Sequence, residues 1–326
     1  MRRSHRLGVI VNPVAGHGRG RTGGHTVLTE LARCGYEVVD LSGQSATDAL
    51  RHAHSARADY DALVVVGGDG MAHLGFNAVA GTPTPLGLIA VGSGNDLARS
   101  LGLPIHDVPA GIALIGAALS GPPRRIDAIE TTVAAPHPAR VSTRPDGLDW
   151  AAAIVSAGFD AAVNDRANSY RRPRGGARYV RGVLAELRTF RPYGYRLTID
   201  GATREFDGAL VALANGRTFG GGMAIAPDAR LDDGLIDVVI ARDIGRAELL
   251  RVFPRVYRGT HVDHPAVEVL RARHVRIEAI EGHPSPVPVA FADGEPLGAV
   301  PLEATIRPGA VRFLGPGRGG HPRAVG

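Results

Sequence analysis

Glycine-rich segments follow three short apolar runs in the first third of the chain. They are Asn12-Pro-Val-Ala-Gly16, Gly67-Gly-Asp-Gly70 and Gly92-Ser-Gly-Asn-Asp96. Glycine lets backbone N–H groups approach a phosphate closely and wrap around it. A helix that begins after such a turn adds partial positive charge. One turn of this kind alone is best explained as a tight connection, but three of them together, two holding an Asp, predict a phosphate site.

Asp69 and Asp96 are the acidic residues of these turns. Carboxylates at the ends of adjacent strands can bind Mg²⁺ directly or through water. Asp96 could instead form part of a helix cap with Asn95, and Asn95 could itself bond a nucleotide phosphate or ribose. The sequence therefore predicts a magnesium–phosphate site, with the helix cap as an alternative role for Asp96.

Strand-like and helical segments alternate over the first 130 residues. Short β-branched runs of this kind are typical of buried parallel strands. This alternation predicts a doubly wound, mainly parallel sheet that binds its ligand at the carboxyl ends of the strands. Strands are expected at 7–11, 36–41, 62–66 and 86–91, and helices near 22–34, 46–56, 72–80, 96–101 and 112–119.

Strands separated by Pro-rich loops predominate after Arg125, which predicts a mainly antiparallel β-sandwich. We therefore expect an α/β domain over 1–127, a β-rich domain over 128–315 whose last part can return to the first domain, and a flexible tail over 316–326. Strands of the second domain are expected at 151–155, 196–199, 210–214, 236–240 and 275–278, and helices near 177–190 and 246–257.

All 37 basic residues are Arg, and the chain contains no Lys. This excludes a Walker P-loop, a protein kinase and a Schiff-base enzyme, because each needs a lysine amine. The net charge of +5 mildly favours acidic partners. No basic motif studded with aromatic residues is present, so nucleic acid is not an expected partner.

Several features favour a cytoplasmic location. Cys34 is the single cysteine, which fits a reducing compartment. The basic N-terminal stretch passes straight into a strand, without the apolar core of a signal peptide. A membrane-spanning helix needs roughly 20 apolar residues, and the apolar stretches here are about half that length. We expect a soluble protein that contacts membranes only peripherally.

The three turns resemble the nucleotide site of the diacylglycerol kinase catalytic domain family, whose pattern is close to NPxxG…GGDGT…GTxND. GGDG alone also occurs in NAD kinases and phosphofructokinases, but here further motifs follow in the family's order. The Asn164–Asn168 segment looks most like actinobacterial diacylglycerol kinases. The further motifs are Ser156-Ala-Gly-Phe-Asp160, Asn215-Gly216 with Gly220-Gly-Gly222, Ala226 to Asp237, and Phe291-Ala-Asp-Gly-Glu-Pro-Leu297.

The resemblance implies a lipid kinase that uses ATP and Mg²⁺ to phosphorylate diacylglycerol to phosphatidic acid, with ATP in the first domain and the lipid in the second. It places Asp69, Asp96 and Asp127 in a magnesium–water network. A structural Mg²⁺ would bind Asp233 and the backbone carbonyls of Arg230 and Leu235. The implied nucleotide contacts are Asn12, Gly16, Gly67, Gly68, Asp69, Gly70, Met71, Ser93, Gly94 and Asn95.

The implied catalytic residues are Asp69 and a general base, with Glu295 preferred over Asp293. Asp293-Gly-Glu295 is also a strong hairpin signal on its own. Two departures from the family pattern are Met71 in place of Thr and His73 in place of Asn. The alternatives that remain are a sphingoid-base-like or other lipid kinase, an NAD kinase, and a catalytically dead membrane-binding regulator.

Arginines cluster around the expected helix at 177–190. They can form an ordinary solvated face or dock on anionic lipid, where each basic residue contributes roughly 1 kcal/mol. A lipid acceptor favours the second interpretation, so the expected partner is diacylglycerol at an anionic membrane surface; a homodimer remains open. Arg178, Arg181 and Arg188 are expected on the outer side, and Tyr179, Val183, Leu184, Leu187 and Phe190 in a buried stripe.

Overall fold

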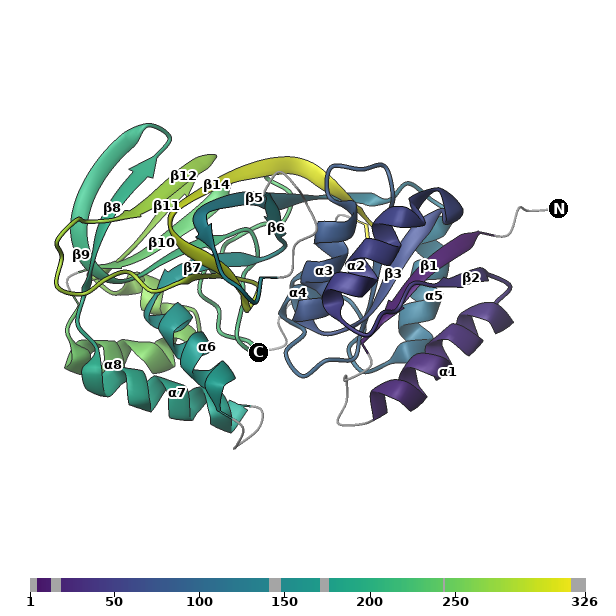
Figure 1. The fold of residues 1–326 in the computed structure, drawn as a ribbon, viewed down its shortest axis with the longest axis horizontal. Coiled ribbons are helices and arrows are strands. Elements are labelled where there is room, and N and C mark those ends of the chain that lie inside the picture. Colours follow the sequence, from purple (N-terminus) through teal and green to yellow (C-terminus); the bar gives the residue numbers. More distant parts are fainter. Residues whose placement is uncertain (1–4, 13–18, 141–147, 171–175, 243, 318–326) are drawn as a thin grey trace. The chain divides into compact units, whose positions relative to one another are not determined.

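A computed structural model of the chain describes residues 5–12, 19–140, 148–170, 176–242 and 244–317 (Figure 1). The chain divides into two units. The parallel unit runs as far as Ala128 and resumes at Gly309, and the antiparallel unit lies between Ile129 and Pro308. The chain therefore returns to the first unit at Gly309, whereas the expected second domain extended to residue 315.

The parallel unit contains the strands and helices expected from the sequence, displaced by a few residues at their ends. Helix α5 shows the local reason for one boundary: the Asp107 side chain accepts a hydrogen bond from Ala110 N, which caps the first turn. The elements are β1 (Arg6–Val11), α1 (Arg19–Arg33), β2 (Glu37–Asp40), α2 (Ala46–Ser55), β3 (Ala62–Gly67), α3 (Asp69–Val79), β4 (Leu86–Ala90), α4 (Asp96–Leu101), α5 (Val108–Leu119) and the start of β5 (Arg124–Pro136).

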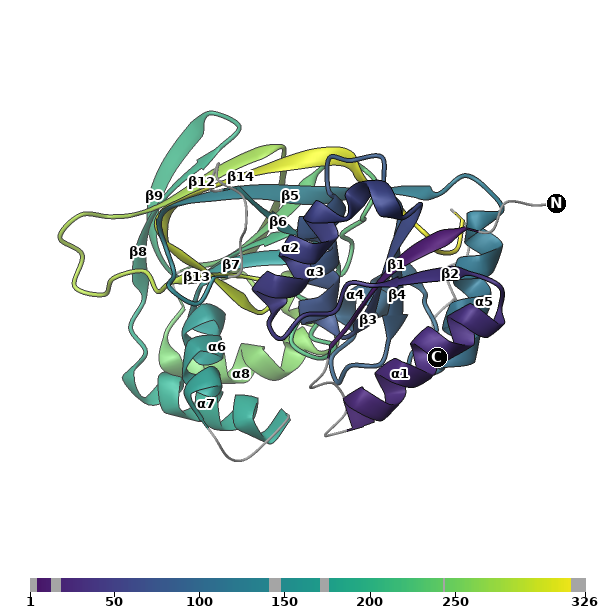
Figure 2. The same ribbon diagram turned by 45° about the vertical axis from the view of Figure 1, so that its right-hand side comes forward.

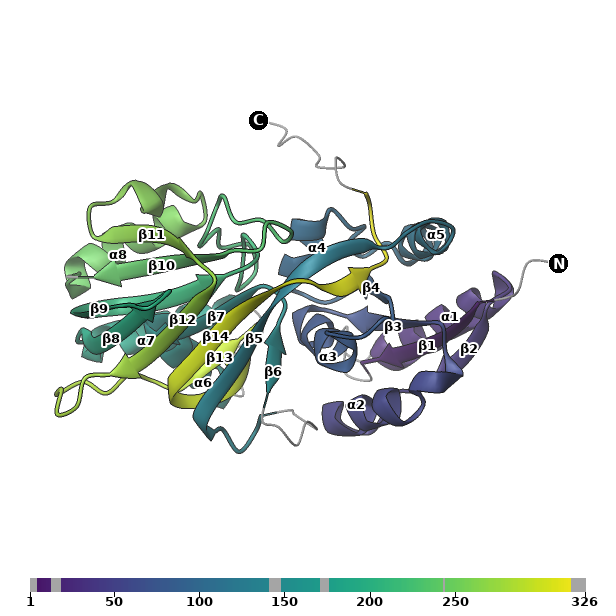
Figure 3. The same cartoon turned by 90° about the horizontal axis from the view of Figure 1, so that it is seen from above.

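Strands β4, β3, β1 and β2 lie side by side in that order, and every pairing among them is parallel. Helices α1 and α5 pack on one face, where Leu31 and Ile115 join one buried cluster with Val64. Helices α2 and α3 lie on the opposite face (Figure 3). The sheet is therefore doubly wound, as predicted. Because its strands are parallel, the turns that follow β3 and β4 leave the sheet at the same edge.

The antiparallel unit contains strands joined mostly by short turns, with three helices. Its strands pair antiparallel throughout the described ladders. The elements are the rest of β5, β6 (Asp149–Ala151), β7 (Ile154–Gly158), α6 (Phe159–Ser169), α7 (Gly176–Thr189), β8 (Tyr193–Ile199), β9 (Ala202–Ala214), β10 (Ile236–Arg242), α8 (Arg246–Val256), β11 (Val267–Ala272), β12 (His274–Ala279), β13 (Ala290–Ala292) and β14 (Glu295–Phe313).

The sheet of the antiparallel unit closes on itself. Strand β9 pairs with β7, β7 with β13, β13 with β14, β14 with β12, β12 with β8, and β8 again with β9. A ring of this kind encloses a core that includes Tyr195, Val211, Ile277 and Leu302. The predicted sandwich is thus a closed ring, because β9 and β14 are long enough to belong to both of its walls.

Helices α6, α7 and α8 lie together on the outside of this ring (Figures 1 and 2). They share a second apolar cluster that includes Phe159 from α6, Phe190 beside α7, and Leu249 from α8. Helix α6 occupies a segment for which the sequence predicted no helix. Within the part of the chain that the structure describes, no helix combines the length and the apolar character needed to cross a membrane.

Two further expectations are wrong. The strand expected at 151–155 is interrupted, since β6 ends at Ala151 and β7 begins at Ile154. Leu184, expected in the buried stripe of α7, is exposed. The buried side of that helix follows Val183 and Phe190, and Leu184 lies about 100° away from Val183 around the helix.

Candidate functional site

The turns that follow β3 and β4 are in direct backbone contact. A Cβ atom added to Gly92 would lie 2.3 Å from the Cα of Gly68, so only glycine fits there. Val91 N and Gly92 N both donate hydrogen bonds to Gly67 O, at 3.0 and 3.3 Å. The glycines therefore let two loops merge into one backbone surface at the carboxyl edge of the sheet.

Asp69 and Asp96 meet beside this surface. A Cβ added to Gly94 would lie 2.3 Å from Asp69 Oδ2 and 3.9 Å from Asp96 Oδ2, so both carboxylates reach the same point. Asp69 Oδ1 accepts a hydrogen bond from Leu97 N at 3.2 Å, and Asp96 forms an ion pair with Arg99 at 3.4 Å. Two carboxylates beside a glycine turn are the donors that Mg²⁺ prefers, so these residues fit the expected ion.

The Asn95 side chain shapes the turn that it belongs to. This residue has left-handed backbone geometry, with φ of 60°. Its Oδ1 accepts from Gly92 N at 3.0 Å, and its Nδ2 donates to Gly92 O at 2.5 Å. The amide expected to contact a nucleotide is thus buried and bonded within the loop. Ser93 is exposed on the same turn, and its contact with ATP stays a prediction.

Asn12 joins the group from the end of β1. Its backbone N–H donates to Val66 O at 3.2 Å. A Cβ on Gly67 would lie 3.6 Å from the Asn12 Cβ and 2.4 Å from the Met71 Cγ. Met71 is buried against Gly67, so it occupies the interior side of the turn. Gly16 lies outside the described residues, and Gly70 is exposed at the start of α3.

Asp127 is held by a different part of the chain. It is buried on β5, and its Oδ1 accepts a hydrogen bond from Gly309 N at 2.7 Å. Both residues belong to the parallel unit. The carboxylate therefore fixes the point where β14 re-enters this unit, and its place in a magnesium–water network stays a prediction.

Asp293 and Gly294 form the two-residue hairpin loop between β13 and β14, as the hairpin signal predicted. Their φ angles are 51° and 88°, and Ala292 pairs with Glu295 across the loop. Positive φ at both positions is typical of a type I′ turn. The segment is thus a tight turn whatever chemistry its carboxylates perform.

The Asp293 carboxylate is occupied by backbone amides. Its Oδ2 accepts from Ala152 N at 2.7 Å, and its Oδ1 accepts from Ala153 N at 2.8 Å and from Ile154 N at 3.1 Å. Charge-assisted bonds of this kind are stronger than neutral ones and hold the acceptor in place. These bonds position the Asp293 carboxylate at the turn, and its assignment as the alternative base stays a prediction.

The Asn215-Gly216 motif forms hydrogen bonds to the carbonyl groups of the same backbone segment. Asn215 Nδ2 donates to Ala152 O at 2.8 Å, and the N–H groups of Asn215 and Gly216 donate to Ala153 O at 2.8 and 3.0 Å. Two motifs that are far apart in the sequence thus converge on two alanines. Ala152 and Ala153 could not be found from the sequence, because their backbone groups, and not their side chains, form these bonds.

Glu295 is the first residue of β14 and is partly exposed. The turn that precedes it is fixed by the bonds of Asp293. Its side chain starts from a rigid backbone position, which favours a precise chemical role. The assignment of Glu295 as the general base stays a prediction.

The loop expected to hold a structural ion carries an excess of negative charge. Asp233 Oδ1 accepts from Leu235 N at 3.1 Å, and its Oδ2 lies 3.9 Å from an Arg271 nitrogen. Burial raises the pKa of Asp237, Arg271 at 3.5 Å lowers it, and the charge of Asp233 raises it again. Asp237 and Arg271 had not been predicted as members of this group, although Asp237 ends the quoted motif.

Asp233 Oδ2 and Asp237 Oδ2 are buried, and among the described residues no donor of good hydrogen-bond geometry reaches either atom. A cation beside Asp233 would satisfy them, so the residues fit the expected Mg²⁺. The expected set has one carboxylate and the carbonyls of Arg230 and Leu235. Within the described ranges no group of three His, Cys, Asp or Glu side chains is arranged to hold a metal, and this Mg²⁺ site stays a prediction.

Asp160 is a second buried carboxyl that the sequence quoted only as part of a motif. It lies in the first turn of α6, close to Tyr193 and Tyr195. Burial raises its pKa to about 6, and Ser156 and Ala161 N–H offset this only in part. Among the described residues no donor of good hydrogen-bond geometry reaches either oxygen.

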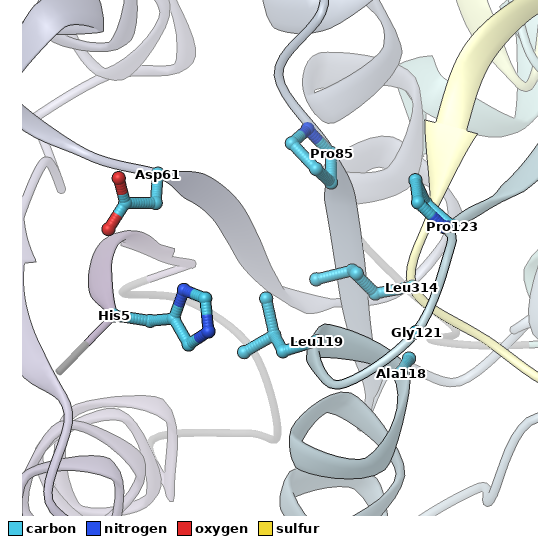
Figure 4. A pocket seen from close by; sticks show the side chains of 8 residues that line it. All are labelled: His5, Asp61, Pro85, Ala118, Leu119, Gly121, Pro123 and Leu314. Carbon is cyan, nitrogen blue, oxygen red and sulfur yellow. The ribbon is translucent and has the colours of Figure 1, made fainter. Parts of the chain in front are cut away.

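A cavity of about 310 Å³ lies at the opposite edge of the parallel sheet (Figure 4). His5, Asp61 and Pro85 line it, and each directly precedes β1, β3 or β4. Leu119 and Leu314 provide apolar walls. Because the glycine turns follow the same strands at their carboxyl ends, this cavity is separate from the candidate phosphate site.

A doubly wound unit with paired carboxylates at its glycine turns, followed by a closed β unit, fits the class of lipid kinases. Residues 6–131 match the diacylglycerol kinase catalytic domain, and residues 153–315 match the YegS C-terminal NAD kinase beta sandwich-like domain. The chain is 36% identical to a diacylglycerol kinase of Mycobacterium tuberculosis over 97% of its own length and 98% of that protein. It belongs to the diacylglycerol kinase family.

Two further comparisons cover nearly the whole chain. A diacylglycerol kinase of Staphylococcus carnosus is 27% identical, with 91% of this chain and 90% of that protein aligned. A crystal structure of a diacylglycerol kinase from Bacillus anthracis superposes with a TM-score of 0.67 at 18% identity, over 96% of this chain and 97% of that one. The structural likeness supports the order and type of the two units.

Proposed function

We propose that this protein transfers the γ-phosphoryl group of ATP to the free hydroxyl of diacylglycerol, which yields phosphatidic acid and ADP. The acceptor oxygen forms a bond to the γ-phosphorus while the bond from that phosphorus to the β,γ-bridging oxygen breaks. The hydroxyl proton passes to a carboxylate, for which we assign Glu295. Phosphoryl transfer of this kind depends mainly on positioning and on stabilisation of charge.

In this proposal the merged turns of Gly67–Gly68 and Gly92 receive the phosphates of the nucleotide. Backbone amides of these turns other than Gly92 N, which is bonded within the loop, replace the lysine that other kinases use, because this chain has none. Asp69 and Asp96 would hold Mg²⁺, which neutralises charge on the phosphates when it is bound. Asn95 keeps the turn in its shape through its two bonds to Gly92.

One observation carries the proposal: Asp69 and Asp96 reach one point at two glycine turns that are in backbone contact. In a chain 36% identical to a diacylglycerol kinase along nearly its full length, this supports ATP as the phosphoryl donor. The same identity favours a lipid acceptor over NAD. The choice of diacylglycerol among lipid hydroxyls rests on the names of its relatives.

The buried position of Met71 bears on the alternative of a catalytically dead regulator. Its side chain packs against Gly67 on the interior side of the turn, so it does not replace either carboxylate. The site keeps both Asp69 and Asp96, and we therefore propose an active enzyme. We also propose that it works at the cytoplasmic membrane surface, where its acceptor resides.

The test is a transfer assay with γ-labelled ATP, Mg²⁺ and a panel of acceptors in detergent micelles: diacylglycerol, monoacylglycerol, a sphingoid base and NAD. We expect label in phosphatidic acid. Asp69→Asn should abolish transfer and keep the circular dichroism spectrum. Label in the sphingoid base or in NAD would show that this compound, and not diacylglycerol, is the acceptor. No transfer to any acceptor by well-folded protein would refute the proposal.

A further inference from the structure

Large apolar side chains gather on the surface of one pair of helices. Among the described residues four large hydrophobic side chains are strongly exposed: Leu184 at 57%, Leu250 at 53%, Tyr257 at 50% and Val269 at 40%. Leu184 lies on α7, Leu250 on α8, and Tyr257 directly follows α8. Three of the four therefore belong to the same two helices.

These two helices are packed on each other. Val183 of α7 and Leu249 and Val252 of α8 belong to one apolar cluster. Arg246 Nε at the start of α8 donates a hydrogen bond to Phe190 O, beyond the end of α7, at 2.7 Å. Both helices lie on the same outer side of the ring of strands (Figures 1 and 2). We call the solvent-facing sides of these two packed helices the α7–α8 face.

The spacing of residues along each helix separates this face from the core. On α7, Arg181, Leu184 and Arg188 recur at intervals of three and four residues, and all are exposed. On α8, Leu250 and the terminal Tyr257 are seven residues apart, which is about two turns. Residues at such intervals lie on one side of a helix. Leu250 and Tyr257 therefore lie along one side of α8, and Leu184 on α7 lies between two arginines on one side of that helix.

Charge on the α7–α8 face is mainly basic. Arg181, Arg188, Arg251 and Arg258 are exposed on or beside the two helices. Each helix has a single acidic residue in its sequence, Glu186 on α7 and Glu248 on α8, and each has a partner of its own. Glu186 pairs with Arg166, and Glu248 lies 3.4 Å from His264. The four exposed arginines outnumber these two carboxylates, so the charge of the face stays positive.

We propose that the α7–α8 face is the surface by which the protein docks on an anionic lipid bilayer. Leu184, Leu250 and Tyr257 enter the boundary between headgroups and acyl chains, and the arginines contact the lipid phosphates. Tyr and Arg suit this boundary, since each has an apolar body and a polar end. The surrounding positive charge selects an anionic membrane over a protein groove, because basic residues near such a surface gain attraction from its potential.

The proposal rests on the proposed function only in that a lipid acceptor resides in a membrane. The experiment is vesicle co-sedimentation of the full chain, with phosphatidylcholine vesicles compared with vesicles that also contain phosphatidylglycerol. Wild-type protein should bind the anionic vesicles, and high salt should weaken this binding. Leu184→Ser with Leu250→Ser should weaken it by about tenfold or more. Val269→Ser is the matched control, since Val269 is exposed on β11 of the same unit, and it should bind like the wild type.

The proposal would be overturned if the double variant bound anionic vesicles as well as the wild type does. It would also be overturned if Val269→Ser lost as much binding as the double variant, or if the wild type did not bind. Sedimentation velocity separates a further outcome: a wild-type dimer that dissociates in the double variant would make this face a contact between copies. The double variant should still phosphorylate a micellar acceptor. Glu295→Gln should bind vesicles normally, so a failure of the transfer assay and a failure of docking give different results.

Discussion

The Asp293 carboxylate accepts a hydrogen bond from the backbone N–H of Ala152 at 2.7 Å, although 141 residues separate them in the chain. Two further amides, of Ala153 and Ile154, donate to the same carboxylate. Asp293 thus holds the break between β6 and β7, and Glu295 two residues later emerges from the turn that Asp293 fixes. We therefore expect the two carboxylates of this motif to have separate roles.

Asp293→Asn should lower the stability of the protein. The amide replaces one acceptor oxygen by an NH₂ group that would face the N–H donors of the β6–β7 break. Since hydrogen bonds to a charged group contribute about 1.5–3 kcal/mol each and are not additive, we expect a loss of about 2–4 kcal/mol in the free energy of unfolding. Urea titration followed by circular dichroism measures it. Unchanged stability together with complete inactivity would make Asp293 the base after all.

Glu295→Gln should lower turnover and leave stability nearly unchanged, in contrast to Asp293→Asn. It keeps the shape of the side chain and removes its basicity, so turnover should fall by about 10²–10⁴ while ATP binding is largely retained. Its unfolding free energy should stay within about 0.5 kcal/mol of the wild type, as for an ordinary surface substitution. Steady-state kinetics and the same urea titration check both. Normal turnover would mean that the proton acceptor is another group.

Gly92→Ala should damage the nucleotide site specifically. The new methyl carbon would overlap the Cα of Gly68, at 2.3 Å, so the two turns must separate. A displacement of about 1 Å at such a site can cost roughly 10² in turnover, and the KM for ATP should rise. Gly121→Ala is the matched control in the same unit, where a Cβ meets nothing within 4 Å. Similar kinetics for the two variants would show that contact between the turns is not required.

Because the Asp160 carboxyl is buried, we expect the stability of the protein to depend on pH. Burial raises its pKa from 3.8 to about 6. Between these values the folded protein keeps the proton that the unfolded chain has released, so stability is fully present below pH 3.8 and is lost as pH rises through about 6. Asp160→Asn has no charge to bury. At pH 7 it should therefore be more stable than the wild type, by on the order of 2–3 kcal/mol.

Thermal and urea unfolding of both proteins from pH 4 to pH 7 would follow this difference. The gap between them should shrink toward pH 4. The exposed Asp165 of the same helix provides the control variant Asp165→Asn, which should track the wild type at every pH. A less stable Asp160→Asn at pH 7 would mean that an ionised Asp160 has a bound cation or another partner.

Magnesium should stabilise the protein through Asp233. If the ion binds the folded chain alone, Mg²⁺ at one hundred times its Kd adds about 2.7 kcal/mol to the free energy of unfolding. Chelation should remove this gain, and Asp233→Asn should lose most of it. The melting temperature with Mg²⁺ and with chelator measures both, and Asp165→Asn again serves as a control. Identical responses of the Asp233 variant and the wild type would leave the loop as a simple turn.

The sequence by itself determined the parallel unit well. Its β-branched runs and the glycines after them are local signals, because a buried strand and a tight turn each depend on the residues within them. The hairpin at Asp293-Gly294 was predictable for the same reason, since type I′ geometry needs residues that tolerate positive φ. The meeting of Asp69 and Asp96 also followed, because parallel strands end at one edge.

Tertiary structure decided what depends on partners far along the chain. The role of Asp293 rests on amides of Ala152–Ile154, whose side chains carry no pattern for it. The ring of the antiparallel unit closes through pairing between β8 and β12, which is set by packing and not by local preference. The exposure of Leu184 likewise depends on which side of α7 meets α8 and the ring. The spacing of apolar residues predicts the direction of a helix's buried side only to within about the rotation that one residue adds. Packing against neighbouring elements then decides which residues lie at the centre of that side.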